Sequence, residues 1–319
     1  MALSPKLLRQ FLLWLVIAIG VYGVTVVLSG VDEMQALLAQ IGAAGWATVI
    51  GLSTLNIVIR FGRWQYYLQS LGHAIPTWPS LQYFLAGFAF TSTPAKAGEM
   101  VRSIYLKRDG VSYSESLAAL FVERLTDLLA VVLLALLAAY QFEDYRWLVI
   151  LAGLATLGML PLVHSQFLRR LLAGAAERIG NPRISKGLLD LSRLLDSSAA
   201  LLRSGPLYGG MLLSMLAAGA VCLMMYFALA ALGADVSLPL AVGIYATGIL
   251  AGALSFLPGG IGSAEAVMIG LLALAGVDLS TATAATLICR IAALWYSIAI
   301  GIVIVLLLEY SARQKPEDS

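Results

Sequence analysis

The chain has 319 residues, of which 60% are hydrophobic and only 12% are charged, and its mean hydropathy is +0.89. Soluble domains usually carry about twice that charged fraction. Composition therefore excludes a soluble protein and predicts an integral membrane protein. The net charge of +2 is too small to identify a partner, and Cys222 and Cys289 lie far apart in apolar segments. We expect no disulfide, metal, cofactor or nucleic-acid partner.

Six apolar segments are long enough to cross a bilayer as helices. The first, 7–29, follows Lys6 and Arg9, so the positive-inside rule places its N-terminus in the cytoplasm. No small-residue cleavage site follows it, which favours an uncleaved helix over a signal peptide. Both termini are then expected on the cytoplasmic side of the inner membrane. The other five segments are 43–59, 115–140, 147–163, 207–232 and 281–308.

The second segment is followed by charged and aromatic residues. Arg60 and Arg63 are expected at the cytoplasmic face, and Trp64, Tyr66 and Tyr67 fit an interfacial aromatic belt.

Two further apolar segments, 80–93 and 238–257, run into proline- and glycine-rich breaks. Lipid cannot satisfy free backbone N–H and C=O groups, so such a break must be covered by protein or line a wet cavity. We interpret both segments as re-entrant helical hairpins that act as gates. The residues predicted to form the breaks are Pro94, Gly98, Pro258, Gly259, Gly260 and Gly262.

The long polar interval 165–204 carries seven Lys or Arg residues against three acidic ones, with leucines at helical spacing. It predicts an amphipathic helix on the cytoplasmic membrane surface, where its basic excess suits anionic headgroups. A positively charged connector that only fixes the topology explains the pattern equally well.

The sequence repeats itself over unit A, 43–140, and unit B, 207–308. Glu99 precedes Arg124 by 25 positions, and Glu265 precedes Arg290 by the same number. Lys and Arg placement predicts opposite orientations for the two units. The predicted fold is an all-α integral membrane protein with one membrane domain over 1–319. It has six full transmembrane helices plus two re-entrant helical hairpins, arranged as the inverted repeats typical of secondary transporters.

Charged residues gather beside the two breaks. A charge in a lipid-facing helix costs at least roughly 2.5–3.5 kcal/mol, so Arg124 and Arg290 are expected to face an interior partner. Static Glu–Arg clamps are one interpretation. The other is that the arginines hold a phosphate, which their planar fork suits, aided by free helix N-termini at the breaks. The candidate substrate-binding residues are Lys96, Glu99, Arg102, Glu123, Arg124, Asp127, Glu265 and Arg290; none is proposed as catalytic.

These residues resemble the lysylphosphatidylglycerol synthase transmembrane-region family, also called the flippase-like domain family. The resemblance rests on PAKAGE ending at Glu99, on GVSYSESLAALFVERLTDL, and on LPGGIGSAEA followed by Arg290, and it covers about 10–310. It implies lipid handling. The family includes the membrane half of enzymes that aminoacylate phosphatidylglycerol and translocate the product. It also includes stand-alone proteins linked to phospholipids, hopanoid-related lipids or polyprenyl-phosphate sugars. Because the chain ends shortly after its last helix, we do not expect the aminoacyltransferase activity.

The leading hypothesis is a transporter that moves an anionic lipid between leaflets, with membrane lipids as its partners. One rival is an intramembrane lipid-modifying enzyme that uses Glu99, Glu123 and Asp127 as acid and base. The other is a membrane scaffold that binds a lipid-linked glycosyltransferase through 165–204.

Overall fold

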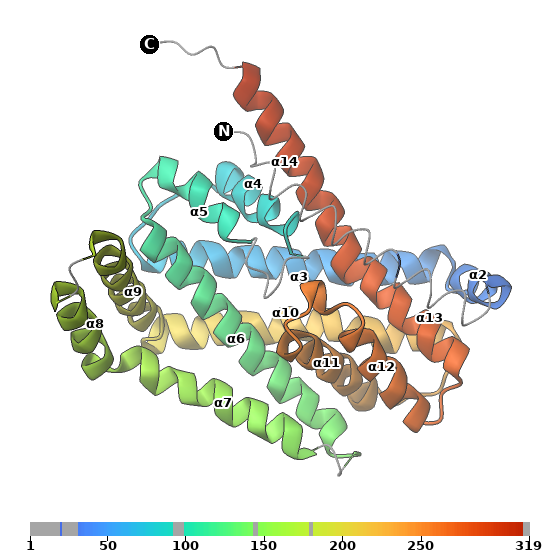
Figure 1. The fold of residues 1–319 in the computed structure, drawn as a ribbon. Coiled ribbons are helices and arrows are strands. Elements are labelled where there is room, and N and C mark those ends of the chain that lie inside the picture. The colour runs from blue at the N-terminus through green and yellow to red at the C-terminus, as the bar shows by residue number, and fades with distance from the viewer. Residues whose placement is uncertain (1–19, 21–30, 92–98, 143–145, 179–180, 315–319) are drawn as a thin grey trace.

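The computed structural model describes residue 20 and residues 31–91, 99–142, 146–178 and 181–314, and these fold into helices without β-strand (Figure 1). Nearly all of the predicted first transmembrane helix, 7–29, lies outside the described residues. So do Pro94, Lys96 and Gly98.

The described chain is a succession of α-helices joined by short turns. The elements are α2 Val31–Gln40, α3 Gly42–Ser70, α4 Thr77–Phe88, α5 Val101–Leu106, η2 Lys107–Asp109, α6 Tyr113–Ala139, α7 Arg146–His164, α8 Gln166–Arg178, α9 Pro182–Leu201, α10 Ser204–Ala231, α11 Leu238–Leu254, η4 Pro258–Gly260, α12 Ser263–Leu274, α13 Leu279–Arg290, the π-helical turn η5 Ile291–Trp295, and α14 Tyr296–Gln314.

Among the described helices, three are long and apolar enough to cross a membrane: α3, α10 and the continuous run Leu279–Tyr310 through α13 and α14. Helices α7 and α8 form a bent pair that could supply a fourth crossing. Helix α6 is 27 residues long but carries Glu123, Arg124 and Asp127. The structure therefore confirms an all-helical membrane protein, and six full crossings remain a prediction.

One local prediction is wrong. Helix α3 does not end near residue 59 but continues to Ser70, and one face of its second half is buried in the protein. Arg63, Trp64 and Tyr67 are all buried. They form no aromatic belt, because they pack against α4, α6 and α10.

Two helix–break–helix segments stand where the sequence predicted hairpins. In the first, α4 and α5 flank residues 89–100, part of which is not described. In the second, α11 folds back on α12 through η4 (Figure 1). A Cβ placed on Gly248 of α11 would lie 2.3 Å from the Met268 side chain of α12, so these two helices pack closely against each other.

The turns before α6 and α13 are built alike, 166 positions apart. Gly110 and Gly276 both adopt the left-handed backbone conformation, with φ of 84° and 88°, which glycine accepts without strain. In each turn the next residue donates its N–H to the carbonyl five positions back. Ser112 and Asp278 then cap the following helix through a backbone N–H. The sequence repeat therefore has a counterpart in the backbone.

The matching helices α3 and α10 lie side by side and antiparallel (Figure 1). Tyr67, near the end of α3, packs on Gly210, near the start of α10, and a Cβ there would meet its hydroxyl at 2.0 Å. Asn56, earlier in α3, donates a 2.7 Å hydrogen bond to the carbonyl of Ala217, later in α10. A later position in α3 thus contacts an earlier position in α10, as expected for two antiparallel helices.

Helices of each unit also pack on the hairpin of the other unit. Helix α6 crosses α11 where Gly243 approaches the backbone of Ala138, and α14 crosses the end of α4 where Gly301 approaches Ala89. A Cβ on either glycine would lie within 2.3 Å of a backbone nitrogen. The two units therefore interlock.

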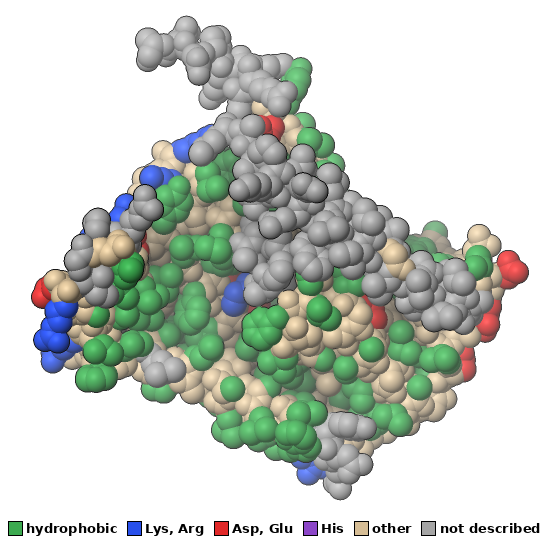
Figure 2. All heavy atoms as spheres, in the orientation of Figure 1, with side chains coloured by type: hydrophobic (Ala, Val, Ile, Leu, Met, Phe, Trp, Pro, Cys, Tyr) green, Lys and Arg blue, Asp and Glu red, His purple; other side chains and the backbone are tan. Residues whose placement is uncertain are grey.

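The surface charges are unevenly distributed between the two ends of the molecule, although acidic residues also occur among the basic ones on α8 and α9 (Figure 2). Acidic side chains gather beside α2, where Asp32 and Glu33 are exposed. Basic side chains gather at the opposite end, over helices α8 and α9, which occupy most of the predicted helical segment 165–204. The exposed basic residues of this end are Arg170, Arg178, Lys186, Arg193 and Arg203.

Candidate functional site

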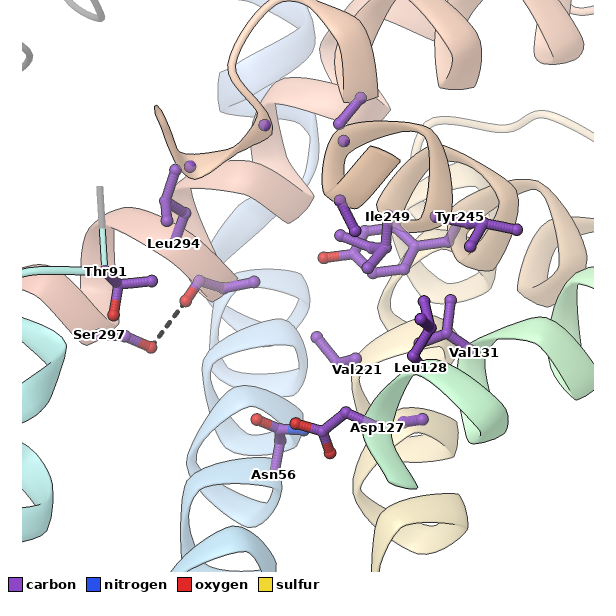
Figure 3. Close-up of a pocket in the computed structure, with 18 of the residues that line it drawn as sticks. Asn56, Thr91, Asp127, Leu128, Val131, Val221, Tyr245, Ile249, Leu294 and Ser297 are labelled. Carbon is purple, nitrogen blue, oxygen red and sulfur yellow. Dashed lines mark hydrogen bonds between the residues drawn. The ribbon is translucent and has the colours of Figure 1, made fainter. Parts of the chain in front are cut away.

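A cavity of about 360 Å³ lies between the two units, among α3, α6, α10, α11 and η5 (Figure 3). Its volume falls within the range of about 300–1,000 Å³ that is typical of ligand sites. Both broken segments reach it, through Thr91 after α4 and through Gly259 and Gly260 in η4. Most of the wall is apolar, and the charged residues that line it are Arg60, Arg124, Asp127 and Arg290.

In unit A, Glu99 is the centre of an ion-pair network. Its carboxylate is fully buried and accepts hydrogen bonds from Arg124 Nη2 at 2.9 Å and from Arg102. Thr91 Oγ1 lies 3.3 Å from its other oxygen. Arg102 also donates to Glu123 at 3.2 Å, and its guanidinium lies over the rings of two aromatic residues of α3 and α4. Such geometry compensates buried charges that would otherwise be costly.

Arg63 joins the same network from α3. Its buried guanidinium donates to Asp127 Oδ1 at 2.5 Å and lies 3.8 Å from Glu123 Oε1. It also donates to Ser214 of α10 and lies 3.5 Å from Thr126 of α6. One side chain therefore ties three helices together.

In unit B, the network is smaller. Arg290 Nε donates to Glu265 Oε1 at 2.6 Å, and Arg290 Nη2 donates to the carbonyl of Gly259 at 2.7 Å. Glu265 Oε2 accepts the N–H of Gly262 at 2.7 Å. Gly259 and Gly262 have φ of 62° and 88°, a conformation that disfavours side chains. The arginine of α13 thus binds both the start of α12 and the break before it.

A π-helical turn follows Arg290 directly. Such turns insert an extra residue into a helix and occur frequently at functional sites. Here the turn supplies two residues of the cavity wall, Ala293 and Leu294.

The structure sorts the sequence-predicted residues into two groups. Arg124, Asp127, Arg290, Gly259 and Gly260 line the cavity. The others lie behind that wall, where they hold the lining arginines or the break in place: Glu99, Arg102, Glu123, Glu265, Pro258 and Gly262. The Glu–Arg pairs expected at 25-residue spacing are both present.

Sequence reasoning missed Arg60, Asn56 and Tyr245 as cavity residues. Figure 3 shows Asn56 from α3, Asp127 from α6 and Tyr245 from α11 around the cavity. Arg60 stands one turn before Arg63 on the same helix, directly after an apolar run. The positive-inside rule assigned both to the membrane surface instead.

Buried guanidinium–carboxylate pairs beside a cavity, enclosed by apolar helices, define an integral membrane protein with a polar interior site. The chain belongs to the lysylphosphatidylglycerol synthase TM region family, whose model matches residues 13–301.

Curated archaeal relatives agree with this assignment. The UPF0104 membrane protein PH1989 of Pyrococcus horikoshii is 24% identical over 322 residues, covering 92% of this chain and 96% of the relative. A UPF0104 membrane protein of Methanothermobacter thermautotrophicus is 28% identical over 235 residues, covering 67% of this chain and 69% of the relative.

Proposed function

We propose that this protein moves an anionic, phosphate-bearing lipid between the leaflets of the membrane, with the headgroup in the cavity and the acyl or prenyl chains in the bilayer. The observation that carries the proposal is the pair Arg124 and Arg290, one from each unit, on the wall of one cavity. Arginine donates parallel hydrogen bonds to phosphate oxygens, and a cavity among apolar helices strengthens them.

The architecture supports alternating access. Antiparallel α3 and α10, the matched turns before α6 and α13, and the interlocked hairpins agree with two inverted repeats. A unit and its inverted copy can exchange conformations, so an inward-open state implies an outward-open state of similar energy. In this scheme α4–α5 and α11–α12 are re-entrant hairpins that gate the two sides.

Glu99 and Glu265 would compete with the lipid phosphate for the arginines. Each carboxylate accepts from its cavity arginine at hydrogen-bond distance, so both of these arginines have a counter-ion within the protein. A phosphate that enters can replace the carboxylate as acceptor, and the carboxylate recovers the arginine when the phosphate leaves.

The separation of surface charge supports an orientation in the membrane. The basic end over α8 and α9 is placed in the cytoplasm, and the acidic end beside α2 is placed outside. The basic helices would then meet anionic headgroups at the cytoplasmic face of the inner membrane.

Arg124→Gln is the sharpest test of the proposal. Glu99 keeps Arg102 as a partner when Arg124 is lost, so the network should survive. In vesicles that contain labelled phosphatidylglycerol, movement between leaflets should fall at least tenfold. Arg108→Gln, at an exposed arginine of η2, is the matched control and should move lipid normally. Equal rates for the folded Arg124→Gln protein and the control would refute the role of Arg124.

The two rival functions predict different results. An intramembrane enzyme would convert its lipid in detergent, where no second leaflet exists. A scaffold would tolerate Arg124→Gln but lose partner binding when the basic residues of α8 and α9 are neutralised. The carboxylates that the enzyme would use, Glu99, Glu123 and Asp127, all lie in ion pairs with arginine, which favours the transporter.

A further inference from the structure

We infer that Arg60, Tyr245 and Arg124 form the phosphate subsite of the cavity, and that this subsite selects a headgroup with a single negative charge, a phosphodiester, over a phosphomonoester. The inference rests on the proposed function and adds to it a binding residue and a substrate class.

Arg60 has donors without acceptors. It lines the cavity from α3, and its guanidinium lies 5.3 Å from the centre of the Phe88 ring. Its Nε and Nη2 atoms are shielded from solvent, yet neither has a hydrogen-bond partner in the protein. Buried polar atoms in proteins are rarely left unpaired, since each unmet group costs about 1–3 kcal/mol. The donors of Arg60 can pair with an acceptor from outside once the side chains that cover them move.

Two neighbours on the wall share this property. The Tyr245 hydroxyl is buried and has no hydrogen-bond partner, and its side chain borders the cavity (Figure 3). Arg124 Nε is likewise buried and without a partner, although Nη2 of the same residue binds Glu99. Three residues from α3, α6 and α11 thus leave N–H or O–H groups unmet around one space. A phosphate brings only acceptor oxygens in its ionised form, which is the chemistry that such donors require.

The charges of the described residues around the cavity indicate the charge of the group that it would bind. The described residues that line it, their ion-pair partners, and the residues that pair with those partners in turn contain five arginines and four carboxylates. The set therefore carries one excess positive charge. The arginines are Arg60, Arg63, Arg102, Arg124 and Arg290, and the carboxylates are Glu99, Glu123, Asp127 and Glu265.

Arg60 is the member of this set without an ion-pair partner within 4.0 Å among the described residues. Buried charges are stable when they are paired, so one additional negative charge completes the cluster. A phosphodiester carries one charge, whereas a phosphomonoester carries about 1.5 to 2 at neutral pH. The monoester would leave an excess negative charge beside Asp127. A phosphodiester with a cationic headgroup would restore the excess positive charge.

Binding in detergent tests this inference without any transport step. The purified full-length protein is titrated with dihexanoyl forms of three lipids: phosphatidylglycerol, phosphatidic acid and phosphatidylcholine. Phosphatidylglycerol should bind most tightly. Arg60→Gln should weaken it about 10- to 150-fold, which is the contribution of a hydrogen bond between charged groups. Arg60→Lys keeps the charge but not the planar fork, so its affinity should fall between those of the natural protein and Arg60→Gln. Arg108→Gln, at an exposed arginine of η2, should bind like the natural sequence.

Stability separates a binding role for Arg60 from a structural one. Since its Nε and Nη2 lack partners and its charge is in excess, Arg60→Gln should melt at the same temperature as the natural protein, or higher, in the absence of lipid. A structural cation would give the opposite result. Unchanged phosphatidylglycerol affinity in Arg60→Gln, equal affinity for phosphatidic acid, or a lower melting temperature would each overturn the inference.

The same variants in vesicles distinguish this inference from the proposed function. If phosphatidylglycerol binds through Arg60 but never changes leaflet, the subsite stands and the transport proposal fails. If the lipid moves and Arg60→Gln moves it equally well, transport stands and the subsite fails.

Discussion

The most direct test of the unit B network is Glu265→Gln. The substitution keeps the shape of the side chain and removes its charge. In the native protein the two carboxylate oxygens accept from Arg290 Nε at 2.6 Å and from the Gly262 N–H at 2.7 Å. An amide offers one oxygen and one NH₂ group, so one of these two donors would face another donor.

The expected loss of stability is large because both partners are buried. The side chains of Glu265 and Arg290 are only 9% and 4% exposed. Removing one member of a buried ion pair typically costs 3–5 kcal/mol, since it leaves the other charge uncompensated. The carbonyl of Gly259 would remain as an acceptor for Arg290, which places the expected value near the lower limit, about 3 kcal/mol.

The free energy of unfolding can be measured by titrating the detergent-solubilised protein with a denaturing detergent and following helix content. Glu177→Gln, at an exposed carboxylate of α8, is the matched control and should stay within about 0.5 kcal/mol of the natural protein. The double variant Glu265→Gln with Arg290→Gln should be more stable than Glu265→Gln alone, because no buried charge is then left unpaired.

Two outcomes would refute this reasoning. A loss below about 1 kcal/mol for Glu265→Gln would mean that the pair is not a buried electrostatic contact. Strictly additive losses in the double variant would mean that Glu265 and Arg290 do not interact.

The remaining predictions concern a helix crossing and a helix cap. Gly301→Ala should destabilise the protein by about 1–3 kcal/mol, because the new Cβ would lie 2.2 Å from the backbone nitrogen of Ala89. Gly219→Ala is the control, since a Cβ there would meet no atom from outside its own stretch of helix within 4 Å, and it should be neutral or slightly stabilising in the same melting experiment. Equal stabilities of the two variants would contradict the close crossing of α4 and α14. Hydrogen bonds from Thr281 lower the pKa of Asp278, so its capping contribution is present above the unfolded-state value of about 3.9 and is lost as the pH falls below it. Asp278→Asn retains the cap but does not titrate, and its melting temperature should fall less between pH 5 and pH 2, as acid-melting curves would show.

Much of this protein follows from its sequence alone. The apolar composition requires a membrane and the hydrogen-bonding needs of a backbone in lipid require helices. The glycine-rich run after Pro258 predicted a break, because glycine accepts the left-handed conformations that Gly259, Gly260 and Gly262 adopt there. The 25-residue spacing predicted the two Glu–Arg pairs, since a repeated spacing in a duplicated unit places equivalent side chains at equivalent points.

The tertiary structure alone decided which charges are inside. Arg60 and Arg63 follow an apolar run, and nearby sequence cannot distinguish a helix that ends at the membrane surface from one that continues into the protein. Arg63 is buried because Asp127 of α6 and Ser214 of α10, 64 and 151 positions away, supply its acceptors. Such partners come together only when helices that are distant in sequence pack against one another. Local sequence patterns therefore determine the helices, and the packing of those helices determines which residues form the site.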